Sequence, residues 1–226
     1  MSIDERRTAA LILDVDGTLL DSNEAHAHAW VEAFSASGVD LDPTDIRPHL
    51  GKGGDLLVPD LLDARAMRRI GDDVRARKKE IFGQKYLPDL RPFPGIRSAL
   101  EKLRARGIHL VLATSAGSEE LDRYLEILDI GGLIDGNTSR SDVSASKPVP
   151  DVFRAALERL DAPAELTAVV GDTPYDILAA HRVALPVVAV RTGGFPDELL
   201  RKAELIFDDV NELAGRIEEL DEWFHE

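Results

Sequence analysis

The sequence contains no cysteine, which excludes disulfide bonds, thiolate metal sites and cysteine nucleophiles. It also contains no apolar run of about 18 residues, the length that a helix needs to cross a bilayer, so we expect no membrane partner. Basic residues are scarce: 27 Lys and Arg stand against 42 Asp and Glu, which gives a formal net charge of −15. Because such a surface repels phosphate backbones, the charge argues against a nucleic-acid partner.

The first ten residues, MSIDERRTAA, carry mixed charge and lead directly into an apolar segment, so we expect no signal peptide. Together with the missing cysteines, this favours a cytoplasmic location. The contents of 44% hydrophobic and 31% charged residues are ordinary for a globular enzyme, and 226 residues leave room for a main domain with a smaller insert. No feature of the sequence identifies a protein partner.

Short apolar runs rich in valine and isoleucine predict strands that are buried on both faces. They lie at 10–14, 108–114, 167–172, 186–191 and 205–207. Helical patterns occupy 94–106, 150–160, 173–182 and 196–202. Strands that alternate with helices indicate the α/β class, with a doubly wound, mainly parallel sheet.

Residues 21–90 interrupt this alternation, because their apolar positions recur at helical spacing and no convincing strand pattern occurs among them. We therefore predict a small α-helical cap domain at 21–90, inserted after the first strand. The core domain would then consist of 1–20 and 91–226.

Polar residues follow three of the predicted strands. They are Asp14 and Asp16 after the first strand, Thr114 and Ser115 after the second, and Asp172 and Asp176 after a later one. In open parallel sheets, ligands bind outside these carboxyl ends of the strands. Lys147 precedes a helix that starts with proline, and we expect this lysine near the same edge of the sheet.

This combination predicts phosphoryl chemistry. Grouped carboxylates, without sulfur or well-spaced histidine ligands, favour Mg²⁺, which binds phosphate oxygens and keeps several waters. Hydroxyl groups and a lysine at the same edge would hold the remaining oxygens of a phosphoryl group. A carboxylate nucleophile, a metal ion and a further cation are the parts that such a transfer uses.

Four segments occur in an order and spacing that resemble the motifs of the haloacid dehalogenase superfamily of phosphohydrolases. They are DVDGTL (14–19), TS (114–115), the lysine of KP (147) and GDTPYD (171–176). The resemblance spans nearly the whole chain and implies a Rossmann-like core. The helical insert is similar to the small cap of subfamily I, as in phosphoglycolate phosphatases and β-phosphoglucomutases. Dehalogenases of this superfamily lack an aspartate at the position of Asp16, so the acid here favours a phosphate ester as substrate.

The resemblance implies catalytic roles for four residues. Asp14 would attack phosphorus and form an aspartyl phosphate, while Asp16 would protonate the leaving group and then activate water. Thr114 would hydrogen-bond the phosphoryl oxygens, and Lys147 would stabilise the charge shared by the nucleophile and the phosphate.

The resemblance also implies how Mg²⁺ would be bound. Its ligands would be Asp14, Asp172 and the backbone carbonyl of Asp16. Asp176 would support the metal from behind these ligands.

Two further candidates for substrate binding have structural alternatives. Ser115 would contact the phosphate or cap the next helix. His26 lies one helical turn from Trp30, at offsets from the first motif that resemble phosphomutase-like caps; the alternative is that both pack in the cap's own core.

Lys52 and Arg47 are candidates for binding a distal anion of the substrate. Lys52 lies in a glycine-rich loop suited to approaching a ligand, and Arg47 is nearby. The alternative for each is a solvated surface cation. The charged stretch 65–85 is interpreted as a solvated helical face, and the alternative is a basic binding surface.

These features favour an Mg²⁺-dependent phosphatase that hydrolyses a small phosphorylated metabolite. The alternative is a sugar phosphomutase of the β-phosphoglucomutase type, which the spacing of His26 and Trp30 favours, whereas the second acid of GDTPYD favours the phosphatase. A non-catalytic module that accepts a phosphoryl group or binds a ligand is a third interpretation. The length of the chain and its helical insert argue against this last class.

Overall fold

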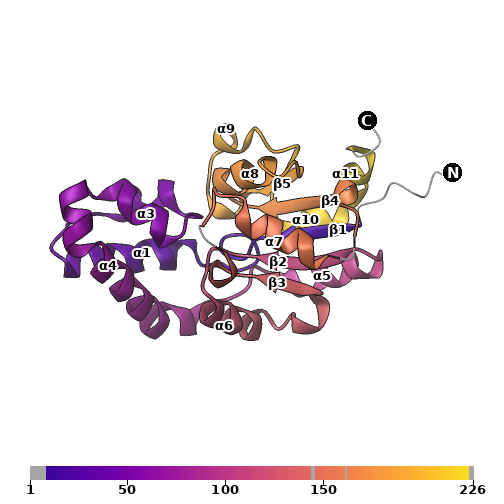
Figure 1. Ribbon diagram of the computed structural model, residues 1–226. Helices are drawn as coiled ribbons and strands as arrows, with labels where there is room; N and C mark the ends of the chain where they lie inside the picture. Colours follow the sequence, from indigo (N-terminus) through magenta and orange to yellow (C-terminus); the bar gives the residue numbers. More distant parts are fainter. Residues whose placement is uncertain (1–8, 144–145, 161, 224–226) are drawn as a thin grey trace.

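The computed structural model describes residues 9–143, 146–160 and 162–223. Within these residues the chain forms a six-stranded parallel sheet with the order β3-β2-β1-β4-β5-β6 (Figure 1). The strands are β1 (Ala10–Leu13), β2 (His109–Ala113), β3 (Gly136–Thr138), β4 (Thr167–Gly171), β5 (Val187–Val190) and β6 (Leu205–Phe207). The prediction of a doubly wound, mainly parallel α/β sheet is confirmed.

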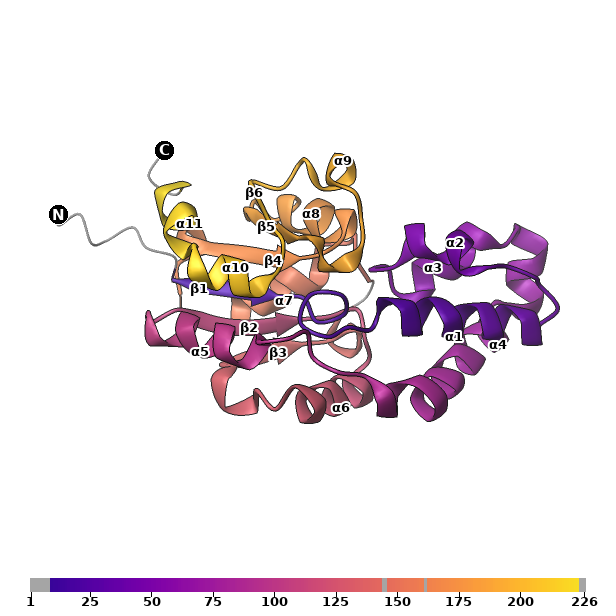
Figure 2. The ribbon, with the colours of Figure 1, turned by 180° about the vertical axis from the view of Figure 1, so that it is seen from behind.

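Helices cover both faces of the sheet, as the two opposite views in Figures 1 and 2 show. One face carries α5 (Ile96–Ala105), α6 (Ser118–Leu128), α10 (Val210–Gly215) and α11 (Ile217–Trp223), and the other carries α7 (Asp151–Arg159), α8 (Pro174–His181) and α9 (Asp197–Leu200). Successive side chains of β1 point to opposite faces, as pleating requires. Leu11 and Leu13 therefore join the first apolar cluster, and Ile12 joins the second.

The sequence pattern does not predict β3. Its three residues, Gly136–Thr138, contain no apolar run, and they form a strand by pairing with the end of β2 at the edge of the sheet. A strand that depends on its neighbour in this way has no signal of its own.

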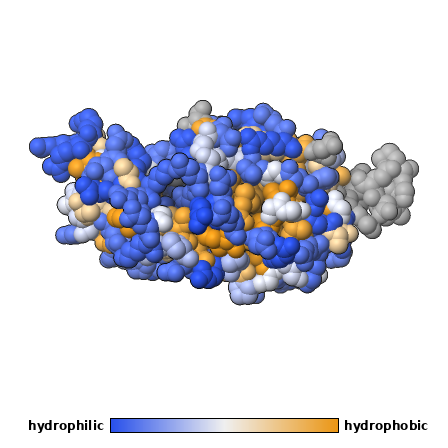
Figure 3. All heavy atoms as spheres, turned by 90° about the horizontal axis from the view of Figure 1, so that it is seen from below, coloured by the Kyte–Doolittle hydropathy of each residue, from blue (hydrophilic) through white to orange (hydrophobic). Residues whose placement is uncertain are grey.

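A helical segment, residues 21–90, lies beside the carboxyl ends of the strands (Figure 1). Its helices are α1 (Asn23–Ala36), α2 (Pro43–Ile46), α3 (Gly54–Leu61) and α4 (Ala64–Ile81). They share an apolar cluster that includes Trp30, Phe34 and Leu57 and differs from the two clusters at the sheet. In Figure 3 the surface over this segment, on the left, is mostly hydrophilic. That the segment acts as a separate cap stays a prediction.

None of the helices in the described parts of the chain combines the length and the apolar character that a bilayer crossing demands.

Candidate active site

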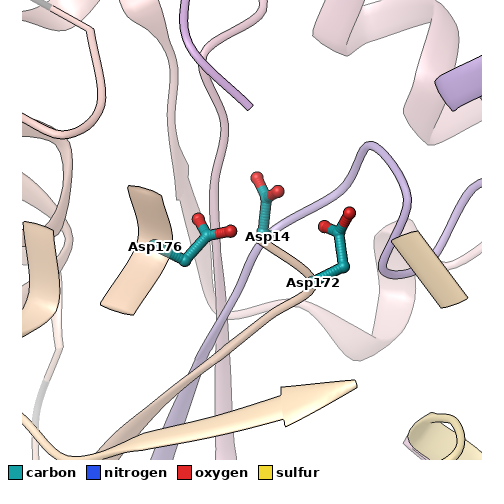
Figure 4. A group of neighbouring side chains, drawn as sticks. All are labelled: Asp14, Asp172 and Asp176. Carbon is teal, nitrogen blue, oxygen red and sulfur yellow. The ribbon is translucent and has the colours of Figure 1, made fainter. Parts of the chain in front are cut away.

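The carboxyl ends of β1 and β4 place two aspartates side by side at the centre of the sheet. Asp14 directly follows β1 and Asp172 directly follows β4, and the two strands are parallel neighbours. Asp176 comes from the first turn of α8. The three buried carboxylates point toward one another (Figure 4), and each offers an oxygen that lies within 4.8 Å of the others.

Lys147 joins this group of aspartates. Its Nζ atom lies 2.5 Å from Asp14 Oδ1 and 2.8 Å from Asp176 Oδ1, and its side chain is 1% exposed. The other oxygen of Asp176 accepts hydrogen bonds from the backbone N–H and the hydroxyl of Thr173. Among the described residues, no well-aligned donor reaches Asp176 Oδ1, so this buried oxygen has only an ion pair.

The electrostatics of the group favour a bound cation. Burial raises the pKa of Asp14 to about 7; Lys147 opposes this shift, and the Asp176 carboxylate adds to it. Burial also raises the pKa of Asp172 well above its ordinary value, and the Asp14 carboxylate raises it further. Burial alone would lower the pKa of Lys147, but its two carboxylate partners raise it, so the lysine stays charged. One ammonium cannot balance three carboxylates, and buried oxygen donors of this kind fit Mg²⁺.

Neighbouring residues hold Asp172 in place. The hydroxyl of Thr18 donates to Asp172 Oδ1 at 2.8 Å, and the side-chain amide of Asn23 donates to Oδ2 at 3.1 Å. Gly17 has a φ of +74°, and a Cβ there would lie 2.3 Å from Asp172 Oδ2. Only glycine suits both its backbone conformation and this close approach. Sequence reasoning missed Asn23, which belongs to the helical segment and carries no motif.

Asp16 contacts residues of the helical segment. Its Oδ1 accepts hydrogen bonds from the hydroxyl of Ser22 at 2.7 Å and lies 2.9 Å from Nε2 of His26. Burial would raise the pKa of Asp16, but His26 and Ser22 outweigh it and lower the pKa to about 2. His26 Nε2 also lies 3.1 Å from the hydroxyl of Tyr124, on α6. His26 is thus both buried and in contact with a motif residue.

The second motif lies at the end of β2. The Thr114 hydroxyl is buried and accepts a hydrogen bond from the backbone N–H of Ala116 at 3.0 Å. Ser115 donates its hydroxyl to the carbonyl of Gly51, in the helical segment, at 3.2 Å. The next helix, α6, is capped by Gly117 instead, so neither hydroxyl takes the capping role.

A pocket of about 610 Å³ lies between the helical segment and the carboxyl ends of the strands. Of the residues expected from the sequence, its lining includes Asp14, Asp16, His26, Lys52 and Ser115. Thr114, Lys147, Asp172 and Asp176 are buried and do not line it. Lys52 forms an ion pair with Asp60 and lies 4.6 Å from the ring centroid of Tyr175.

The structure does not place Arg47 in this pocket. Its guanidinium donates two hydrogen bonds, at 2.7 and 2.8 Å, to the carboxylate of Glu24 on the exposed surface. Most charged residues of 65–85 are exposed, as the interpretation of a solvated face requires, but Arg75, Lys78 and Lys79 also line the pocket. The charged residues of 65–85 follow no helical period, so the sequence does not show which of them line the pocket.

Comparison with known proteins identifies the family. A sequence model described as haloacid dehalogenase-like hydrolase matches residues 8–183. The chain belongs to this family. This haloacid dehalogenase-like hydrolase is 29% identical over 214 residues to a phosphoglycolate phosphatase of Rhodospirillum rubrum, covering 91% of this chain and 89% of that protein. It is 27% identical over 205 residues to a validoxylamine A 7′-phosphate phosphatase of Streptomyces hygroscopicus, covering 89% and 94%.

A solved structure agrees in fold. The haloacid dehalogenase-like hydrolase superposes on a hydrolase from Pseudomonas syringae with a TM-score of 0.81 and 29% sequence identity, covering 94% of this chain and 99% of the other. The expected resemblance to this family is confirmed, and with it the expectation that the chain is a hydrolase.

Proposed function

We propose that this hydrolase is an Mg²⁺-dependent phosphatase that cleaves phosphate monoesters of small metabolites. The observation that carries the proposal is the buried group of Asp14, Asp172 and Asp176 with Lys147, next to a pocket that Asp14 lines. A phosphoryl group has several anionic oxygens. These four residues can bind such oxygens once a divalent ion neutralises the carboxylates. Mg²⁺ held by Asp14, Asp172 and the backbone carbonyl of Asp16, with Asp176 behind them, would neutralise the carboxylate and phosphoryl oxygens.

In the first step a carboxylate oxygen of Asp14 attacks phosphorus, and the bond from phosphorus to the leaving oxygen breaks. An aspartyl phosphate forms, and Asp16 gives its proton to the leaving alcohol. In the second step Asp16 takes a proton from water, the water oxygen attacks phosphorus, and the bond to Asp14 breaks. Lys147 and the hydroxyl of Thr114 support the charge on the phosphoryl oxygens.

The protonation of Asp16 must therefore change during the reaction. With a pKa of about 2 it is ionised at neutral pH, which is the form that the water step uses. The first step uses the protonated form, so Asp16 takes up a proton from solvent in the pocket that it lines, before the leaving group departs. The helical segment acts as a cap in this proposal and excludes bulk water when it closes over the pocket.

A panel of phosphoglycolate, sugar phosphates and nucleotides, incubated with and without Mg²⁺, tests the proposal through the release of orthophosphate. We expect release from at least one monoester, and we expect EDTA to abolish it. Failure to hydrolyse any monoester in the presence of Mg²⁺, or full activity in EDTA, would contradict the proposal.

A phosphomutase is the second candidate, because the spacing of His26 and Trp30 resembles that of phosphomutase-like caps and both residues line the pocket. A mutase would transfer the phosphoryl group to a second hydroxyl of the sugar instead of to water. ³¹P NMR of a reaction with a sugar 1-phosphate separates the two activities, because a mutase yields an isomeric sugar phosphate and a phosphatase yields orthophosphate.

A further inference from the structure

Asp55 joins the helical segment to the core beside the candidate catalytic lysine. It lies in the first turn of α3, and its carboxylate accepts two hydrogen bonds from Ser146, which is 91 residues away in the sequence. The Ser146 hydroxyl donates to Oδ1 at 2.6 Å, and the backbone N–H donates to Oδ2 at 3.2 Å. Arg140 Nε lies 3.7 Å from the same carboxylate. None of these three residues belongs to the four sequence motifs.

Ser146 is bonded directly to Lys147, and both are 1% exposed. The hydrogen bonds to its backbone N–H and to its hydroxyl hold Ser146 itself, the residue directly before the lysine. The ammonium of Lys147 must reach Asp14 and Asp176 at the same time. A displacement of Ser146 is therefore passed on to the position of this ammonium.

The loop that precedes α3, residues 50–53, is shaped for close approach to the core. A Cβ on Gly53 would lie 2.0 Å from the Ser146 hydroxyl oxygen, and a Cβ on Gly51 would lie 2.7 Å from the Thr173 side chain. Gly51 also has a φ of +93°, which favours glycine. Its carbonyl accepts the hydrogen bond from Ser115. The loop thus contacts Ser115 of the second motif, Thr173 of the fourth motif and Ser146 beside the third, and side chains at its glycines would prevent this.

We propose that Asp55 is a positioning residue that holds Lys147 through Ser146, so that docking of the helical segment completes the catalytic group. The inference rests on the proposed phosphatase function. Asp55 acts on the lysine and not on the phosphate, and a positioning residue of this kind changes the rate of the chemical step more than it changes substrate binding.

Steady-state kinetics with the best monoester of the panel tests this role, using Asp55→Ala, Ser146→Ala and the double variant. We expect Asp55→Ala to lower kcat by about tenfold to a hundredfold, with KM changed by less than about threefold. The double variant should be within about twofold of Asp55→Ala, because the two residues act through one contact. Asp55→Asn should lose less than Asp55→Ala, since its amide oxygen still accepts one hydrogen bond.

Asp73→Ala is the matched control. Asp73 is also in the helical segment and also binds a serine and an arginine, Ser37 and Arg77, but it does not line the pocket. We expect its kcat to stay within about twofold of the wild type. If Asp55→Ala does not fold, as judged by its thermal transition, Ser146→Ala and Asp55→Asn decide the question by their kcat.

An Asp55→Ala enzyme with unchanged kcat and a raised KM would overturn the inference, since Asp55 would then bind substrate. Losses from Asp55→Ala and Ser146→Ala that multiply in the double variant would also overturn it. Both outcomes require an active wild type, so they differ from failure of the proposed function, in which the wild type hydrolyses no monoester.

Discussion

Asp14 differs from the other buried carboxylates because the proposed reaction makes and breaks a bond to it. Asp14→Asn keeps the shape of the side chain and an oxygen that can accept the hydrogen bond from Lys147. It replaces the nucleophilic carboxylate with an amide. We expect the turnover number to fall by more than about a thousandfold while the thermal midpoint does not fall, as measured by orthophosphate release and by calorimetry.

Two results would speak against this role. Substantial activity of Asp14→Asn would mean that another group attacks phosphorus. A large loss of stability would mean that the buried charge of Asp14 supports the fold, whereas its raised pKa indicates that the charge is a burden without a cation.

How far single residues could be predicted depends on where they lie in the chain. Asp14 and Asp172 end apolar strands, and the sequence predicts that they meet because parallel strands share an edge. Asp55, Ser146 and Tyr124 have no such signal. Their contacts join segments that lie 91 and 98 residues apart in the sequence. Most polar residues in loops or on helices bind neither a ligand nor a distant side chain, so their presence in the sequence does not predict such a contact.

At the scale of elements, the alternation of apolar runs and helical patterns is sufficient to predict every strand of the sheet except β3. Buried strands such as β4 (Thr167–Gly171) have an apolar sequence that predicts them. Strand β3 and the inward face of α4 have no such pattern, because their structure depends on the elements that they pack against. Helix α4 begins with the cap residue Asp63, whose side chain accepts from two backbone N–H groups. The sequence could indicate that α4 is a helix but not which of its charges face the pocket.

The loop of residues 50–53 supports a second prediction, which concerns the choice of substrate. Lys52 lines the pocket, belongs to the helical segment and forms its ion pair with Asp60 and not with one of the three buried aspartates. Lys52→Ala should therefore lower kcat/KM for the preferred metabolite by about tenfold, equal to about 1.4 kcal/mol, while p-nitrophenyl phosphate loses less than about twofold. The aryl phosphate has no distal anion for the lysine to bind.

Arg47→Ala is the matched control for this comparison. It removes a cation from the same segment, but one that is bound to Glu24 outside the pocket, so both substrates should react as with the wild type. Equal losses on both substrates for Lys52→Ala would assign Lys52 to the chemical step or to folding.

At the scale of the whole molecule, the buried carboxylates make stability depend on pH. Asp14 has a pKa near 7 in the folded protein and an ordinary value of 3.8, so the folded state holds a proton that the unfolded state has lost between these values. The contribution of Asp14 to the free energy of unfolding is therefore favourable below pH 4 and is lost as the pH rises toward 7. The raised pKa of Asp172 acts in the same direction.

Mg²⁺ should reverse this loss, because it binds the ionised carboxylates of the folded state. We expect saturating Mg²⁺ to raise the thermal midpoint by about 5–10 °C at pH 7.5 and by much less at pH 5, where the carboxylates hold protons.

Asp172→Asn is the control variant. It removes one of the buried carboxylates and leaves the surface ion pairs in place, so it shows whether the Mg²⁺ shift of the thermal midpoint comes from the buried group. Without metal at pH 7.5 this variant should melt above the wild type, and Mg²⁺ should shift it little. An equal Mg²⁺ shift at both pH values, or in wild type and Asp172→Asn, would mean that the ion binds elsewhere than at the three buried aspartates.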